Sequence, residues 1–236
     1  MSCVRHHFLV AGRMAGNIVS VTKFLIRWST ATASAICLLA LIRGAAQTNP
    51  ANSMTRQEFL DKLVAAAIER TNHIVRYDPG YVHISYPDGD VPADVGVCSD
   101  EIIRAYRAVG VDLQKEVHED MVRDWNAYPA KTKWQQKRPD PSIDHRRVPN
   151  LMVFLERKGE SLPISRRAED YSPGDIVTWD LGGDVPHIGF VVNVKSAETG
   201  RLLIVHNIGA GPKMEDVLFS WRITGHYRYF GLSVEK

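Results

Sequence analysis

Apolar residues recur at helical spacing in several segments between residues 55 and 159. Residues 55–72 carry one continuous apolar face with a period of 3.6, and Thr55 with Glu58 forms a capping box in front of it. The same period predicts three further helices, from about Cys98 to Gly110, from Leu113 to Met121, and from Val148 to Gly159.

The pattern changes to a period of two in the last third of the chain. Four segments are interpreted as strands joined by turns: 175–180, 187–194, 201–206 and 223–230. Residues 196–200 have the composition of a hairpin connection. Helices followed by antiparallel strands predict an α+β fold with one domain over residues 55–236.

Two long segments follow neither period. Residues 77–97 are rich in Tyr, Pro, Gly and Asp, and residues 124–144 are polar with interspersed aromatic side chains, so we expect both to be irregular loops. A loop as long as the second is commonly functional or mobile. Its Trp125, Tyr128 and Trp134 would form either the wall of a cleft or a satellite of the core.

The composition is that of a globular protein, with 44% apolar and 24% charged residues among 236. Residues 1–46 contain five basic residues and no acidic residue. The rest of the chain therefore has 24 basic against 27 acidic residues, a net charge of −3. This balance argues against a nucleic-acid-binding protein.

The N-terminal segment has the features of an export signal. A cationic region over residues 1–27 precedes a short apolar run, Ala31–Ile42, and small residues that end at Ala46. We expect a signal peptide over residues 1–46, a linker over 47–54 and an exported protein, periplasmic or secreted, with no stable membrane span after cleavage. An uncleaved anchor is the alternative, although the run has only about half of the roughly 20 residues that a spanning helix needs.

Cys98 is the only cysteine beyond the predicted signal peptide. Exported proteins normally pair their cysteines in disulfides, so a single one is either a buried inert thiol or a reactive one. At the start of a helix, the N–H groups and the dipole would lower the pKa of the thiol. Asp100 and Glu101 would oppose this effect, so that a neighbouring imidazole is needed to activate the sulfur.

Two histidines of the predicted hairpin are candidates for that imidazole. His187 begins one strand and His206 ends the next, so both side chains can lie on one face near the helix start. In this arrangement Cys98 is the nucleophile, His187 the base and His206 the residue that orients the base. Asn207 would take the orienting role if the register slipped by one residue, because such a slip reverses the faces.

Three sequence blocks in this order carry a resemblance to a known family. They are Tyr86, twelve residues before Cys98-Ser99; Pro173-Gly174-Asp175 before an apolar strand; and His187-Ile188-Gly189. With them the sequence resembles the NlpC-type branch of papain-like cysteine peptidases, bacterial cell-wall hydrolases, and within it an exported family described only as a domain of unknown function. The resemblance covers about half of the chain, from Tyr86 to Gly209.

The resemblance implies a papain-like fold, with N-terminal helices packed on a C-terminal antiparallel sheet. It also implies a Cys-His-His thiol hydrolase that needs no cofactor and cleaves amide bonds in peptidoglycan or its stem peptides. Tyr86, Ser99 and Asn207 become candidates for contacts with the substrate or the oxyanion. The sequence departs from the family at Val97, where relatives have Asp, and at Asp100, where they have Gly. Both positions are expected to flank the substrate cleft. The bond that typical family members cleave therefore cannot be assigned to this protein.

Two other classes of function remain as alternatives. One is a non-catalytic module that binds the cell envelope on the same scaffold. The other is a zinc site made by Cys98, His187 and His206, although the chain lacks both a His-Glu-x-x-His and a Cys-x-x-Cys motif, and we predict no metal. The sequence is silent on the oligomeric state.

Overall fold

The computed structural model describes residues 54–232 of the chain. The predicted signal peptide and the predicted linker up to residue 53 lie outside the described residues. Within residues 54–232, no helix combines the length and the apolar character that a membrane crossing requires.

Five α-helices lie between residues 56 and 158 of the described chain. They are α1 (Arg56–Arg70), α2 (Cys98–Ala108), α3 (Leu113–Arg123), α4 (Ala130–Lys133) and α5 (Val148–Lys158). The predicted capping box is present: Thr55 Oγ1 accepts from Glu58 N, and the Glu58 carboxylate accepts from Thr55 N. Gly110, with a φ of +85°, follows the end of α2 in the left-handed conformation that favours glycine. The helices predicted from about Cys98, Leu113 and Val148 are confirmed.

The second half of the chain forms a six-stranded antiparallel sheet. Its strands are β3 (Glu160–Ser161), β4 (Ile176–Asp180), β5 (Pro186–Lys195), β6 (Leu202–Asn207), β7 (Pro212–Glu215) and β8 (Arg222–Arg228), in the order β3-β8-β4-β5-β6-β7. The four predicted strands and the α+β class are confirmed. The sequence pattern missed β3 and β7, because two and four residues are too few for an alternation to be recognised.

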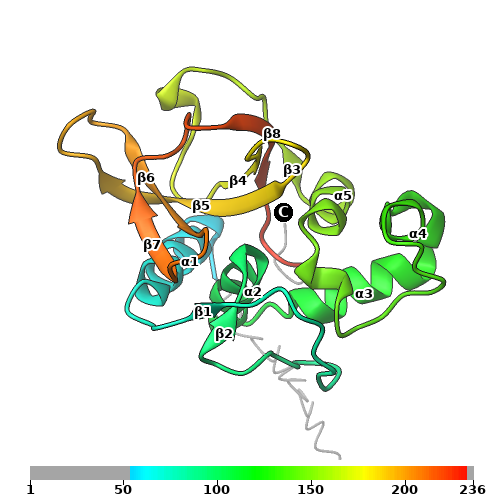
Figure 1. Ribbon diagram of the computed structural model, residues 1–236. Coiled ribbons are helices and arrows are strands. Elements are labelled where there is room, and N and C mark those ends of the chain that lie inside the picture. Colours follow the sequence, from blue (N-terminus) through cyan, green and yellow to red (C-terminus); the bar gives the residue numbers. More distant parts are fainter. Residues whose placement is uncertain (1–53, 233–236) are drawn as a thin grey trace, which may run out of the picture. The chain divides into compact units, whose positions relative to one another are not determined.

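The two faces of the sheet pack against different partners. Ile188 and Phe190 on β5 face the core that the helices share, whereas Val191 on β5 faces a second, smaller core around Trp179. Figure 1 shows α1 and α2 below β5, with α5 beside β3 and β8. The start of α2 therefore lies next to the central hairpin of β5 and β6.

The segments predicted to be irregular contain short elements. Residues 77–97 are largely irregular, but β1 (Arg76–Tyr77) and β2 (Val95–Gly96) pair in parallel at their ends. The expectation of an irregular loop over residues 124–144 is wrong in part. This segment contains α4, the 3-10 turn η1 (Trp125–Ala127) and the start of η2 (Asp144–Arg146), elements too short for a periodic pattern.

Candidate active site

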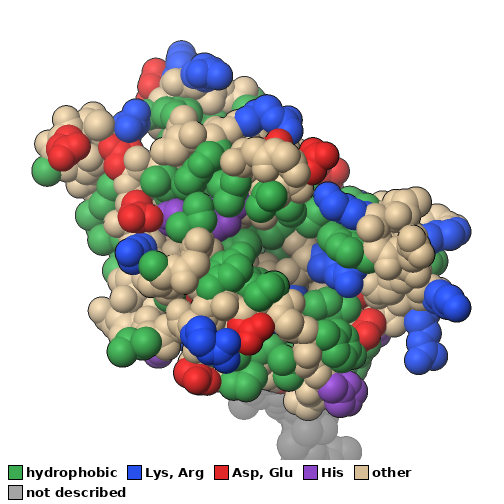
Figure 2. All heavy atoms as spheres, in the orientation of Figure 1, with side chains coloured by type: hydrophobic (Ala, Val, Ile, Leu, Met, Phe, Trp, Pro, Cys, Tyr) green, Lys and Arg blue, Asp and Glu red, His purple; other side chains and the backbone are tan. Residues whose placement is uncertain are grey.

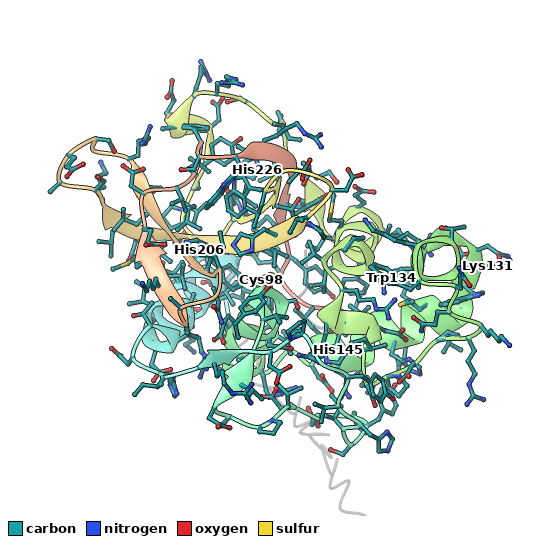
Figure 3. All side chains as sticks on the ribbon, viewed as in Figure 1. Cys98, Lys131, Trp134, His145, His206 and His226 are labelled. Atoms are coloured by element: carbon teal, nitrogen blue, oxygen red, sulfur yellow. The ribbon has the colours of Figure 1, made fainter. Side chains whose placement is uncertain are left out.

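Cys98 is the first residue of α2, and its thiol lies against β5. The sulfur is within hydrogen-bond reach of the backbone N–H of Ile188, of the N–H of Ser99 and of the Tyr77 hydroxyl. Ile188 directly follows His187 in β5, so the fold brings the thiol to the strand position next to the predicted base. Figure 3 shows Cys98 on α2 below this strand.

The pKa of the Cys98 thiol is raised to about 11, which corrects the expectation of a lowered value. Burial is the main cause, since only 4% of the residue is exposed and the interior disfavours a thiolate. The hydrogen bonds from Ile188, Ser99 and Tyr77 favour the thiolate, and Asp100 opposes it. At neutral pH the resting sulfur is therefore a protonated thiol that needs a base.

His187, His206 and Glu215 form a chain of hydrogen bonds. His187 Nε2 lies 2.8 Å from His206 Nδ1, and His206 Nε2 lies 2.9 Å from Glu215 Oε2. A carboxylate accepts hydrogen bonds, so Glu215 requires the proton of a neutral His206 to be on Nε2. His206 Nδ1 is then an acceptor, and His187 must donate to it from Nε2. This order of donors leaves the lone pair of neutral His187 on Nδ1, the nitrogen that can take a proton.

Two tryptophans enclose the pair of histidines. The Trp221 ring centroid lies 6.1 Å from both imidazoles, and the Trp179 ring centroid lies 6.0 Å from that of His187. Burial among these rings, with a smaller effect from His206, lowers the pKa of His187 to about 3. Burial also lowers the pKa of His206, against the raising effect of Glu215. Figure 2 shows histidine atoms framed by hydrophobic side chains on this side of the molecule.

Tyr86 does not lie at the thiol. Its side chain is exposed, its hydroxyl is 3.5 Å from Glu119 Oε1 and its ring packs edge-on against His118. Tyr77 takes the place beside Cys98 that Tyr86 was expected to fill. The sequence holds two tyrosines between Tyr77 and Cys98, Tyr81 and Tyr86, and spacing alone does not select among residues of an irregular loop.

Ser99 and Asp100 are structural residues. The buried Ser99 hydroxyl donates to the Arg146 carbonyl at 2.6 Å, so it is not available to a substrate. Asp100 is 2% exposed and does not flank a cleft; it binds the Arg146 guanidinium through both carboxylate oxygens, at 2.8 and 2.9 Å. Arg146 also donates to the carbonyls of Asp78 and Gly80, which ties the segment after Tyr77 to the start of α2.

Glu215 is a site residue that the sequence pattern missed. It lies on β7, whose pairing with β6 sets Glu215 opposite Ile204, two residues before His206. The short strand carried no recognisable alternation, so nothing in the sequence connected Glu215 with His206.

Asn207 lies on β6 directly after His206. The hydrogen bond with His187 is formed by His206 and not by Asn207. Within residues 54–232, no group of three or more His, Cys, Asp or Glu side chains is arranged to hold a metal ion.

Alkylation of Cys98 tests the protonation state of the resting thiol. We expect the rate with iodoacetamide to rise about tenfold per pH unit between roughly pH 7 and 10 and to level off near pH 11, because only the thiolate reacts. The rate is measured by mass spectrometry on the peptide that contains Cys98. A fast rate that stays constant between about pH 5 and 8 would instead indicate a thiolate–imidazolium pair.

The fold and the site together define an α+β domain that carries a helix-start cysteine beside a His–His–Glu chain. The chain belongs to the family described as Domain of unknown function (DUF1287), which matches residues 64–229. It is also 55% identical over 154 residues to "Uncharacterized protein YijF" of Escherichia coli (strain K12), over 65% of this chain and 74% of that protein. The resemblance to a domain family of unknown function is thereby confirmed, and the matched span contains all the site residues named above.

Proposed function

We propose that this protein is an exported thiol hydrolase, a peptidase or amidase of the NlpC type with a papain-like fold. Its substrate would be an amide bond in peptidoglycan or its stem peptides, and it would work in the bacterial cell envelope without a cofactor. The observation that carries the proposal is the directed hydrogen-bond chain from Glu215 through His206 to His187, which ends one residue from the contact of β5 with the Cys98 thiol.

The chain of hydrogen bonds supports general-base catalysis. As the Cys98 sulfur attacks the amide carbon, its proton passes to Nδ1 of His187, and the positive charge that forms is stabilised by His206 and Glu215. The same nitrogen then returns the proton to the leaving amine, which gives a thioester that water hydrolyses. The Cys98 N–H at the start of α2 is one of the free donors of the first turn and is suited to hold the oxyanion.

The predicted signal peptide supports export, and the net charge of −3 beyond it gives no reason to invoke nucleic acid as a partner. The resemblance to cell-wall hydrolases supports peptidoglycan as the substrate. A fold does not determine a substrate, so this part of the proposal depends on direct measurement.

The burial of Cys98 favours a second candidate, a non-catalytic module that binds the cell envelope. A thiol that is 4% exposed, with a pKa of about 11, also suits a structural cysteine packed between a helix and a sheet. The two candidates differ in whether the thiol forms a covalent intermediate.

Digestion of purified peptidoglycan tests the proposal. We expect the protein to release new soluble fragments, read by liquid chromatography and mass spectrometry, and the Cys98→Ala variant to release them at least about 10⁴-fold more slowly. The fragment masses would identify the bond. Binding of peptidoglycan without any fragments from the wild-type protein would support the binding module and refute the hydrolase.

A further inference from the structure

Asn207 carries a buried amide group without a hydrogen-bond acceptor. The residue is fully buried, and its Oδ1 accepts from Gly209 N at 3.1 Å, but its Nδ2 has no partner among the described residues. Buried donors are nearly always paired, because an unpaired one has lost its water without compensation. An orphan donor beside a candidate nucleophile is therefore a candidate contact for a ligand.

The side chain of Asn207 lies on the helix-facing side of the sheet. Val205 shares the core of Cys98 and Ile188, and Asn207 follows Val205 by two residues on a strand whose pairing with β7 is regular. His206 points to the opposite face together with Ile204, which belongs to the core around Trp179, and His187, which pairs with Trp179 on β4, points to that face as well. The thiol and the imidazole therefore lie on either side of β5, with the His187–Ile188 peptide, whose N–H contacts the sulfur, between them. Asn207 therefore shares the face of Cys98 and is not the residue that orients His187.

The register of the central hairpin brings Asn207 to the sulfur. Gly189 pairs with His206, so Ile188 stands opposite Asn207 at the open end of the ladder. The N–H and C=O of Val191 both point to the β4 side, where they bond Asp175 O and Gly174 N. Backbone groups alternate in direction along a strand, so the N–H of Ile188 points toward β6. This N–H contacts the Cys98 sulfur, which places the sulfur in the space between Ile188 and Asn207.

We propose that the Asn207 side-chain amide is a catalytic residue that donates a hydrogen bond from Nδ2 to the oxyanion. This inference rests on the proposed thiol hydrolase. When the sulfur bonds to the carbonyl carbon, the π electron pair moves onto the oxygen and the thiol proton moves to His187. Nδ2–H and the Cys98 N–H then hold the negative oxygen until the C–O double bond re-forms and the leaving group departs with its electron pair.

Two reactions of the Cys98 thiol distinguish an oxyanion donor from a residue that only supports the fold or the reactivity of the thiol. Acylation of Cys98 by p-nitrophenyl acetate passes through a tetrahedral oxyanion and releases p-nitrophenolate, whereas alkylation by iodoacetamide is a direct displacement without one. We expect Asn207→Ala to lower the ratio of the acylation rate to the alkylation rate by about 10²- to 10³-fold, the loss typical of a missing oxyanion donor. Asn207→Asp keeps the acceptor for Gly209 N and the size of the side chain, and is expected to lower the ratio equally.

Two controls accompany these variants. Asn193→Ala changes an exposed asparagine of the same hairpin and is expected to leave the ratio unchanged. Cys98→Ala supplies the background from all other nucleophiles of the chain. An unchanged ratio in both Asn207 variants, with Cys98 still acylated, overturns the role of Asn207 and leaves the hydrolase standing. Acylation that is absent from the wild-type protein, or that persists in Cys98→Ala, overturns the hydrolase itself and this inference with it.

Discussion

Replacement of His187 by alanine is expected to slow hydrolysis at pH 7 by about 10³- to 10⁴-fold. With a thiol pKa of about 11, only about one Cys98 in 10⁴ is a thiolate at pH 7, so a reaction without the base relies on this small fraction. The loss should shrink by about tenfold for each pH unit up to roughly pH 10, because the thiolate then forms without help. The measurement is the rate of fragment release from peptidoglycan as a function of pH.

Two further variants test whether the loss in His187→Ala comes from unfolding or from the removal of any histidine. His187→Gln retains a polar side chain of similar length and should show the same pH-dependent loss, and its thermal unfolding shows whether the domain is intact. His73→Ala changes an exposed histidine on the surface and should leave hydrolysis unchanged. A loss in His187→Ala that is the same at pH 7 and pH 10 would mean that His187 does not act as the base for Cys98.

Replacement of Asp100 by alanine is expected to lower the free energy of unfolding by about 3–5 kcal/mol, the cost of leaving a buried charge unpaired. Both side chains of the Asp100–Arg146 pair are nearly fully buried, at 3% and 2% exposure. The carboxylate also accepts from Val97 N at 2.7 Å, so the variant loses a contact at the start of α2 as well. In a domain of this size the midpoint of thermal unfolding should fall by roughly 10 °C.

An exposed ion pair provides the matched control for Asp100. Glu160 binds Arg56 at 2.9 Å, and the two side chains are 42% and 40% exposed, so Glu160→Ala should cost less than about 1 kcal/mol. Chemical denaturation of both variants beside the wild-type protein measures the difference. A loss of less than 1 kcal/mol in Asp100→Ala would show that Arg146 reaches water when its partner is removed.

Much of the fold was predictable from residue patterns, because its long elements bury one regular face. Thr55 and Glu58 mark the start of α1 with local hydrogen bonds, and β4, β5 and β6 are rich in apolar residues because a core lies on each face of the sheet. The elements that escaped prediction, such as α4 and β7, have four residues each, and β7 pairs with β6 across a short turn. Four residues are too few for a helical period or an alternation to be recognised.

Some residues of the candidate site could also be predicted from the sequence, and others could not. Cys98, His187 and His206 could be selected from the sequence because a single cysteine at a helix start and two histidines at strand ends are recognisable positions. Tyr77 and Glu215 could not, since one lies at the edge of an irregular loop and the other on a strand of four residues. Their positions depend on how those segments pack around the start of α2 and the end of β6.

The order of residues determined the α+β class, the main helices and strands, and the cysteine and histidines that the site combines. The tertiary structure decided the protonation states and the neighbours: burial raises the pKa of Cys98 and lowers that of His187, and β7 brings Glu215 to His206. It also turned Asp100 and Ser99 inward and left the buried Asn207 amide without a hydrogen-bond acceptor. These outcomes depend on desolvation and on the register of the strands, because both arise only when the segments pack together.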